Sequence, residues 1–243
     1  MSTTESIPVA SDLAVLRAEG VAVLDEPAGK SLLQTVGIEI PTGVVVHSAK
    51  GAADAVERVG LPCAVKLAAR DLPHKSDVGG VAGPLSSALE VETAASRMLR
   101  SAPPSTQGLL VEPWVRGSAE LFLGLSMNTP YGPVVVFGAG GIWVEEHRDV
   151  AYRVAPVDER EALDMVLSRR ATRLLEGKRG TGSVDLAQVA AVVQQFSRLA
   201  LDPAVRDHVQ EIEVNPLIAR AEGMPVAVDC TVVLRAPVSA PRR

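Results

Sequence analysis

The stretch LPCAVKLAARDLPHKSDVGGV, residues 61–81, decides how the rest of the sequence is interpreted. Its first part is an apolar run that contains Lys66, and its second part is a polar turn that ends in Gly79 and Gly80. Backbone N–H groups approach an anion closely only where no Cβ intervenes, and a lysine supplies positive charge. A buried strand followed by such a loop therefore predicts a phosphate site. The alternative is an edge strand whose lysine reaches water along apolar surface, followed by an ordinary surface loop.

Length and composition indicate a globular chain. With 243 residues, 47% of them hydrophobic and 22% charged, the chain can bury a full core as one large domain or two lobes. A net charge of −5 and a pI near 5.5 argue against a nucleic-acid partner. Cys63 and Cys230 lie in apolar runs, which predicts buried thiols in a reducing compartment rather than a disulfide or a metal site.

One uncharged run, residues 121–144, is long enough to span a bilayer. It contains the turn signal NTPYGP at 128–133 and further glycines, so two strands joined by a turn are expected instead. The N-terminus has no basic segment followed by an apolar one, so no signal peptide is expected. These features predict a cytoplasmic protein with no membrane contact.

The remaining pattern predicts alternating helices and strands. Residues 1–23 carry no firm structural signal and are expected to form a leader, and residues 237–243 a tail. Helices are expected from Leu24-Asp25-Glu26-Pro27 to Gly37 and over 49–59, 88–101, 158–168, 170–176 and 184–201. Strands are expected near 43–47, 63–68, 108–115, 149–156, 211–217 and 226–229, besides the two in 121–144.

Acidic and amide side chains gather near the C-terminus. In a strand over 211–217, Glu213 and Asn215 share one face while Ile212 and Val214 face the core, and a neighbouring strand brings Asp229. These are hard oxygen ligands, and Mg²⁺ needs only one or two protein carboxylates together with water and substrate phosphates. The alternative is an edge strand with solvated acids.

The glycine-rich stretch VVVFGAGGIWVEE, residues 134–146, invites assignment to a dinucleotide-binding fold. The third glycine of that fingerprint would fall on Trp143, and strand-like residues follow instead of a helix. This assignment is therefore rejected.

Five landmarks in order resemble the ATP-grasp domain of nucleoside-diphosphate-forming acyl-CoA synthetases, in particular the ATP-grasp (beta) subunit of ADP-forming acetyl-CoA synthetase. The most specific landmark is Lys66 in its strand, followed later by HKSDVGG at 74–80, a seven-residue run that matches the family without a gap, although the family's Ser-Pro after the lysine strand is Ala69-Arg70 here. The other matches are GI-x-x-P at 37–41, the apolar run 108–115, FG-x-GG-I-x-VE at 137–145 with D-V-x-x-R-x-A-P at 149–156, and E-x-NP-L at 213–217. The resemblance covers about residues 24–235.

This resemblance implies an α+β ATP-grasp fold over residues 24–236, with two lobes clamping a nucleotide. The small lobe would span about 42–108 and the larger lobe the remainder. It also implies that ATP or ADP and Mg²⁺ are the cofactors. By the same resemblance, the hinge between the lobes, which meets adenine, is formed by Glu112, Pro113, Trp114 and Val115, and Glu120 holds the ribose. The other implied nucleotide-binding residues are Lys66, Gly79, Gly80, Gly140 and Gly141.

The implied catalytic residues are His74, Lys66 and Arg153, and the implied metal ligands are Glu213, Asn215 and Asp229. An arginine at a strand end can hold phosphoryl oxygens bidentately, although a salt bridge to Asp149 or Glu145 is the alternative. The resemblance implies that a histidine on the CoA-binding portion carries the phosphoryl group and that His74 acts as a second carrier. A neutral imidazole is a competent nucleophile near pH 7, which is compatible with that role. The alternative for His74 is a structural loop histidine bonded to a carboxylate.

The function implied is that of an acid–thiol ligase: acyl-CoA + ADP + phosphate gives acid + CoA + ATP, reversibly, through phosphohistidine. The chain has no room for the CoA-binding and ligase domains, so a CoA-binding alpha-type subunit is expected as partner in a hetero-oligomer. The alternatives are a catalytically silent ATP-binding regulatory subunit and an ATP-grasp carboxylate–amine ligase. Neither needs a carrier histidine, so the presence of His74 argues against both.

Overall fold

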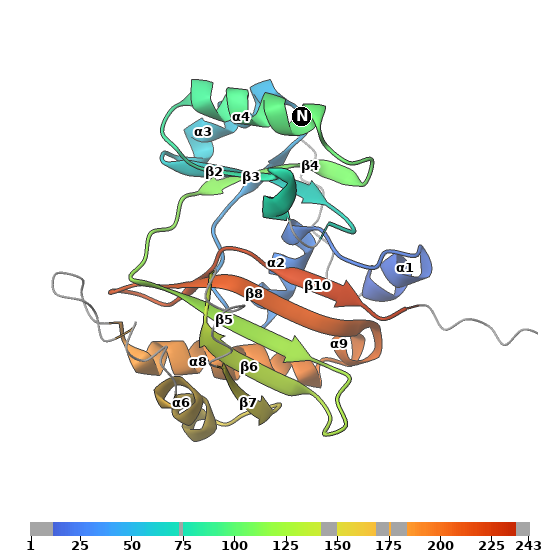
Figure 1. Cartoon of the computed structure of the whole chain (residues 1–243), viewed down its shortest axis with the longest axis vertical. Coiled ribbons are helices and arrows are strands. Elements are labelled where there is room, and N and C mark those ends of the chain that lie inside the picture. The colour runs from blue at the N-terminus through green and yellow to red at the C-terminus, as the bar shows by residue number, and fades with distance from the viewer. Residues whose placement is uncertain (1–11, 73–74, 142–149, 169–174, 176–183, 237–243) are drawn as a thin grey trace, which may run out of the picture.

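The structure is a computed structural model that describes residues 12–72, 75–141, 150–168, 175 and 184–236. The predictions for His74, Asp149 and Glu145 and for most of the helix 170–176 lie outside these residues. Figure 1 shows two lobes, each built on its own sheet, with the small lobe above the large one. This is the expected α+β architecture with two lobes.

The small lobe is a four-stranded antiparallel sheet in the order β1-β4-β2-β3, covered by helices α3 and α4. Its strands are β1 (Val44–Val46), β2 (Cys63–Ala69), β3 (Val81–Leu85) and β4 (Thr106–Pro113), and its helices are α3 (Ala49–Val59) and α4 (Ala88–Arg100). The hydroxyls of Ser48 and Ser87 cap the two helices. The sheet continues to Pro113, past the expected boundary near residue 108.

The position of β2 in the sheet decides whether Lys66 lies on a buried strand or on an edge strand. The strand pairs with β3 on one side and β4 on the other, and every residue in it is buried. Lys66 is only 6% exposed. The alternative of an edge strand whose lysine reaches into water is therefore wrong.

The large lobe is built on an antiparallel sheet in the order β10-β8-β5-β6-β7, with β9 paired to β8. Its strands are β5 (Ala119–Ser126), β6 (Val134–Ala139), β7 (Val150–Val154), β8 (Val209–Ala219), β9 (Val226–Ala227) and β10 (Thr231–Leu234). Its helical segments are α1 (Leu13–Ala18), α2 (Glu26–Thr35), α6 (Glu159–Leu167), α8 (Leu186–Ser197), the 3₁₀ turn η3 (Arg198–Leu201) and α9 (Pro203–His208).

The core of the large lobe lies between one face of this sheet and the helices. Leu121, Leu123 and Leu125 alternate along β5 and pack in the same apolar cluster as Val192 and Phe196 of α8. β5 and β6 are antiparallel neighbours, so the expected pair of strands in residues 121–144 is confirmed over the described part. Within the described segments no helix is long and apolar enough to cross a membrane.

Part of the expected leader is folded. The short helix α1 buries Leu13 and Leu16 in the core of the large lobe. Arg17 holds the other end of the chain, because its Nε donates to the carbonyl of Arg235 at 3.0 Å and its Nη2 to that of Ala236 at 2.7 Å. A helix of six residues is too short to show a helical period in the sequence, and its stability comes from tertiary packing.

Candidate active site between the lobes

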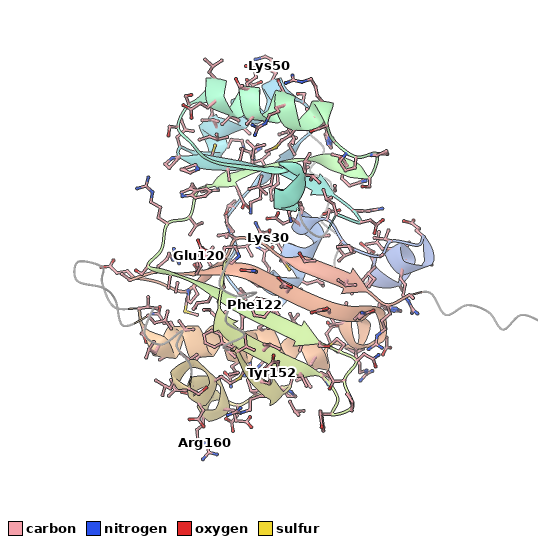
Figure 2. The ribbon with its side chains drawn as sticks, viewed as in Figure 1. Lys30, Lys50, Glu120, Phe122, Tyr152 and Arg160 are labelled. Atoms are coloured by element: carbon pink, nitrogen blue, oxygen red, sulfur yellow. The ribbon has the colours of Figure 1, made fainter. Side chains whose placement is uncertain are left out.

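The start of helix α2 places two charged side chains on one face. The side chain of Asp25 accepts a hydrogen bond from the Ala28 N–H at 3.0 Å, and Pro27 occupies the first turn, so the helix begins at Glu26. Lys30 follows one turn later, in the i, i+4 relation that brings two helical side chains together. In Figure 2 the labelled Lys30 lies between the two lobes.

Four buried side chains form a closed ring of alternating charge. The Lys30 ammonium lies 2.7 Å from Glu26 Oε1 and 2.6 Å from Glu112 Oε2. Lys66 closes the ring, 2.9 Å from Glu26 Oε1 and 2.7 Å from Glu112 Oε1. Because Glu26 and Lys30 belong to α2 while Lys66 and Glu112 belong to β2 and β4, the ring joins the two lobes. We call these four residues the ion ring.

Lys75 and Asp229 extend the ion ring toward the C-terminal strands. The Lys75 ammonium lies 2.9 Å from Glu26 Oε2 and 2.8 Å from Asp229 Oδ1. Lys75 opens the short 3₁₀ helix η2 (Lys75–Val78), and Asp229 stands between β9 and β10. The six side chains carry three positive and three negative charges, so the cluster is neutral as a whole.

Opposing effects set the ionisation of this cluster. Burial alone would raise the pKa of Glu26, but the ammonium groups of Lys30, Lys66 and Lys75 outweigh it and hold that pKa well below its ordinary value of 4.5. Burial alone would lower the pKa of Lys66, yet Glu26, Glu112 and Asp229 raise it above the ordinary 10.5. The pKa of Lys75 is raised in the same way, against burial, by Glu26 and Asp229. These three groups are therefore ionised at neutral pH.

Lys66 and Lys75 differ in how many of their hydrogen-bond donors are engaged. An ammonium group has three donors, and Lys66 directs them at Glu26, Glu112 and the backbone carbonyl of Val228. Lys75 contacts two carboxylates, those of Glu26 and Asp229. Lys66 is thus fully engaged, so an incoming anion would have to replace one of its partners.

The predicted glycine pair after Lys75 is only partly as expected. Gly79 has a positive φ of 67° and is exposed. The Gly80 N–H donates to the Lys75 carbonyl at 2.8 Å, and a Cβ at Gly80 would lie 2.8 Å from that same oxygen. Gly80 is therefore needed for a tight turn, with its N–H bound inside the protein and not directed at a ligand.

The predicted hinge lies where the chain passes from the small lobe to the large one. Glu112 and Pro113 end β4, and Trp114 and Val115 begin the link to β5, which Figure 1 shows running between the two sheets. The Trp114 N–H donates to the Pro62 carbonyl at 2.9 Å, and its half-exposed indole lies so close to Gly83 that a Cβ there would be 2.8 Å from the ring. The side chain of Glu112 belongs to the ion ring, which the sequence did not reveal.

A second group of predicted residues meets at the start of β5. The Gly140 N–H donates to the Glu120 carbonyl at 2.8 Å, and the Gly141 N–H donates to Asn215 Oδ1 at 2.9 Å. The Glu120 carboxylate occupies the space where a side chain at Gly141 would stand. Glu120, Gly140, Gly141 and Asn215 therefore lie together at this point of the large lobe.

We expect Gly140→Ala to destabilise the large lobe. A Cβ at this position would lie 2.5 Å from the backbone of Leu121, which cannot move aside as a side chain can. Overpacking of this kind typically costs about 1–3 kcal/mol, measurable as a drop in the free energy of unfolding in urea. Gly124→Ala is the matched control, because its nearest neighbour is the Phe122 ring at 3.2 Å. Equal stability of the two variants would contradict this expectation.

The predicted metal ligands stand on adjoining segments. Ile212 and Val214 of β8 are buried in the core, so Glu213 and Asn215 share the opposite face as expected. The Val228 N–H bonds the Pro216 carbonyl at 3.3 Å, which brings Asp229 alongside Asn215. The donors are two carboxylates and an amide oxygen, a set that suits Mg²⁺ in chemical type. In the described part of the chain, no three His, Cys, Asp or Glu side chains form a ready-made metal cluster.

The structure places Arg153 apart from the ion ring. It pairs with Val135 across β6 and β7, so it shares the face that packs against the helices, whereas Glu213 pairs with Gly124 on the opposite face. Its guanidinium donates to the Tyr152 carbonyl at 2.9 Å. A phosphate contact by Arg153 would require the side chain to pass around the edge strand β7.

Sequence reasoning missed Glu26 and Lys30. Both were assigned only to the beginning of a helix, because an acid in the first turn is ordinary there. A faint signal exists in their spacing, since an i, i+4 pair of opposite charge on a helix with apolar neighbours can be buried as a unit. Nothing in the sequence shows that two lysines and a glutamate from the other lobe meet this pair.

Comparisons with known proteins agree with this architecture. The profile of the ATP-grasp domain family matches residues 15–234. The beta subunit of ADP-forming acetate–CoA ligase I of Pyrococcus furiosus is 31% identical over 87% of this chain and 91% of that subunit. The ADP-forming 4-hydroxybutyrate–CoA ligase of Nitrosopumilus maritimus is 31% identical over 82% of this chain but 29% of that ligase, so the chain spans under a third of its length.

A solved structure extends the comparison to three dimensions. The dinucleotide-forming acetyl-coenzyme A synthetase 1 of Ca. Korarchaeum cryptofilum was solved with coenzyme A and Mg-AMPPCP, its phosphohistidine segment pointing towards the nucleotide-binding site. It matches 93% of this chain and the whole of the compared chain, with a TM-score of 0.80 and 30% identity. By the extent of the profile match and the agreement in fold, the chain belongs to the ATP-grasp domain family.

Proposed function

We propose that the chain is the nucleotide-binding subunit of an ADP-forming acyl-CoA synthetase and transfers a phosphoryl group between MgATP or MgADP and a phosphohistidine. The observation that carries this proposal is the pair Lys66 and Lys75, buried between the lobes and held charged by carboxylates. Phosphoryl transfer depends on positioning and charge neutralisation, and two fixed ammonium groups at one point supply both.

The phosphates would lie between the lobes, near Lys75 and the exposed Gly79. The hinge over Glu112–Val115 would meet the adenine, and Glu120 at the start of β5 would accept hydrogen bonds from the ribose hydroxyls. Asp229, Asn215 and Glu213 would hold Mg²⁺, which supplies positive charge to the β- and γ-phosphate oxygens when bound. The hydrogen bond that the Gly141 N–H donates to Asn215 Oδ1 fixes the Asn215 side chain in place.

In the transfer step, a lone pair on the His74 imidazole attacks the γ-phosphorus of ATP. The N–P bond forms as the bond to the bridging oxygen breaks, and ADP leaves with that electron pair. Cationic groups stabilise the negative charge on the leaving oxygen and on the new phosphoramidate. The match to the P. furiosus beta subunit over nearly its full length supports this role.

The overall reaction would be acyl-CoA + ADP + phosphate to acid + CoA + ATP, with a CoA-binding subunit as partner. The coverage of the relatives favours this, because the chain matches 91% of a beta subunit and 29% of a longer CoA ligase. Buried free thiols at Cys63 and Cys230 are in keeping with a reducing, cytoplasmic location.

The test is incubation of the purified chain with γ-labelled ATP and Mg²⁺, alongside a His74→Ala variant. We expect acid-labile, base-stable label on the wild-type chain and none on the variant, because a phosphoramidate resists base and hydrolyses in acid. ATP binding without label, even after the CoA-binding subunit of a relative is added, would favour the silent regulatory subunit. ADP release that depends on an added amine would favour a carboxylate–amine ligase.

A further inference from the structure

Glu26 is the carboxylate at which three lysines meet. Its side chain is fully buried, with Lys30 and Lys66 on Oε1 at 2.7 and 2.9 Å and Lys75 on Oε2 at 2.9 Å. Among the ion pairs of the described residues, the other carboxylate of the ion ring, Glu112, pairs with two lysines, Lys30 and Lys66. Glu26 is therefore the group that couples Lys75 to Lys66.

The helix that carries Glu26 is firmly fixed to the large lobe. Ala28, Leu32 and Leu33 are buried in its core, and α2 approaches β10 so closely that a Cβ at Gly29 would lie 3.3 Å from Val232 Cγ2. Figure 1 shows α2 between the small lobe and β10. The Glu26 carboxylate is therefore a fixed point against which small-lobe side chains are held.

The two lysines have no other common anchor of this kind in the contacts described. Lys66 belongs to the central strand β2 and Lys75 to the 3₁₀ helix η2, which is a separate element further along the chain. Ordering a lysine side chain costs rotamer entropy. An anchor that orders both before the ligand arrives removes this cost from binding.

We propose that Glu26 is a positioning residue for the phosphate site: it fixes the ammonium groups of Lys66 and Lys75 at one point between the lobes before a nucleotide enters. This inference rests on the proposed function, since it assumes that these lysines receive phosphate oxygens. Lys30 has the complementary part. Its ammonium group pairs with both Glu26 and Glu112, the two carboxylates that hold Lys66. Because Lys30 neutralises part of their negative charge, they do not repel the phosphates.

The experiment measures the affinity of the full chain for MgADP by calorimetry, together with the rise in Tm that MgADP produces. Glu26→Gln keeps the shape of the side chain and removes its charge. Glu26→Asp keeps the charge but is one methylene too short to reach all three lysines. Glu57→Gln is the control, because it removes the same charge from an exposed position on α3.

We expect Glu26→Gln to weaken MgADP binding at least about tenfold at a temperature well below its Tm, and Glu26→Asp to weaken it by a smaller factor. Both variants should lose part of the MgADP-induced rise in Tm. A purely structural role would lower the Tm of the free protein and leave the affinity of the folded protein unchanged.

The failure of this inference is distinguishable from failure of the proposed function. If the wild-type chain binds no MgADP, the proposed function fails first. If the wild type binds and either folded variant binds equally well, the positioning role of Glu26 is overturned. Should Glu26→Gln not fold, Glu26→Asp decides, because it keeps a carboxylate for the buried lysines.

Discussion

Replacing Lys66 by Met is expected to lower the free energy of unfolding by about 3–5 kcal/mol, the cost of removing one partner from a buried ion pair. Lys66 is 6% exposed, and its ammonium is shared by Glu26, Glu112 and the Val228 carbonyl. The variant would leave two buried carboxylates with fewer cations and a carbonyl without its donor. Urea unfolding at pH 7 measures the loss.

Lys50→Met is the matched control for this prediction. Like Lys66, Lys50 forms an ion pair, in its case with Asp54 alone at 3.2 Å. Its side chain, however, is 80% exposed on the surface of α3. A solvated pair of this type on a helix contributes at most a few tenths of a kcal/mol. If Lys66→Met and Lys50→Met changed stability equally, the ion ring would contribute nothing beyond a surface contact.

The Lys66→Met variant also tests the site. If phosphate oxygens replace one of the three partners of Lys66, MgADP affinity must fall with the loss of this ammonium, and Lys50→Met must leave it unchanged. A folded Lys66→Met variant with wild-type affinity would place the phosphates elsewhere, and Lys75 would be the remaining buried lysine of the small lobe among the described residues.

Residues with a strong local pattern were predictable from the sequence. The helix caps Ser48 and Ser87 and the paired strands β5 and β6 follow from chemistry that acts within a few residues. Lys66 was identified because a lysine in an apolar strand, followed by a glycine-containing loop, suits a phosphate site and matches the motif of the family. The face shared by Glu213 and Asn215 followed from strand alternation alone.

The remaining features depend on contacts between distant segments. Glu26 and Glu112 are 86 positions apart in sequence, and only the packing of α2 against both lobes brings them to the same lysines. For Arg153, the motif gave the position in the chain but not the register of β7. That register follows from pairing with β6 and places the side chain on the helix-covered face.

Acid should remove the contribution of Glu26 to stability, and moderate alkali should not remove that of the lysines. A carboxyl group whose pKa is lowered on folding stabilises the native state fully above its ordinary pKa of 4.5, and this contribution is lost as the pH falls through the lowered value. The pKa values of Lys66 and Lys75 are raised, so their contribution is complete below the ordinary 10.5 and declines only above it.

The measurement is the difference in unfolding free energy between wild type and Glu26→Gln across the pH range. Other carboxyl groups titrate in both proteins and cancel in this difference, so it isolates the charge on Glu26. We expect a constant difference of about 3–5 kcal/mol between pH 5 and pH 10, shrinking below pH 4.5. A difference that instead grew as the pH fell would mean that Glu26 is protonated in the native state, and that the three lysines around it do not hold a carboxylate.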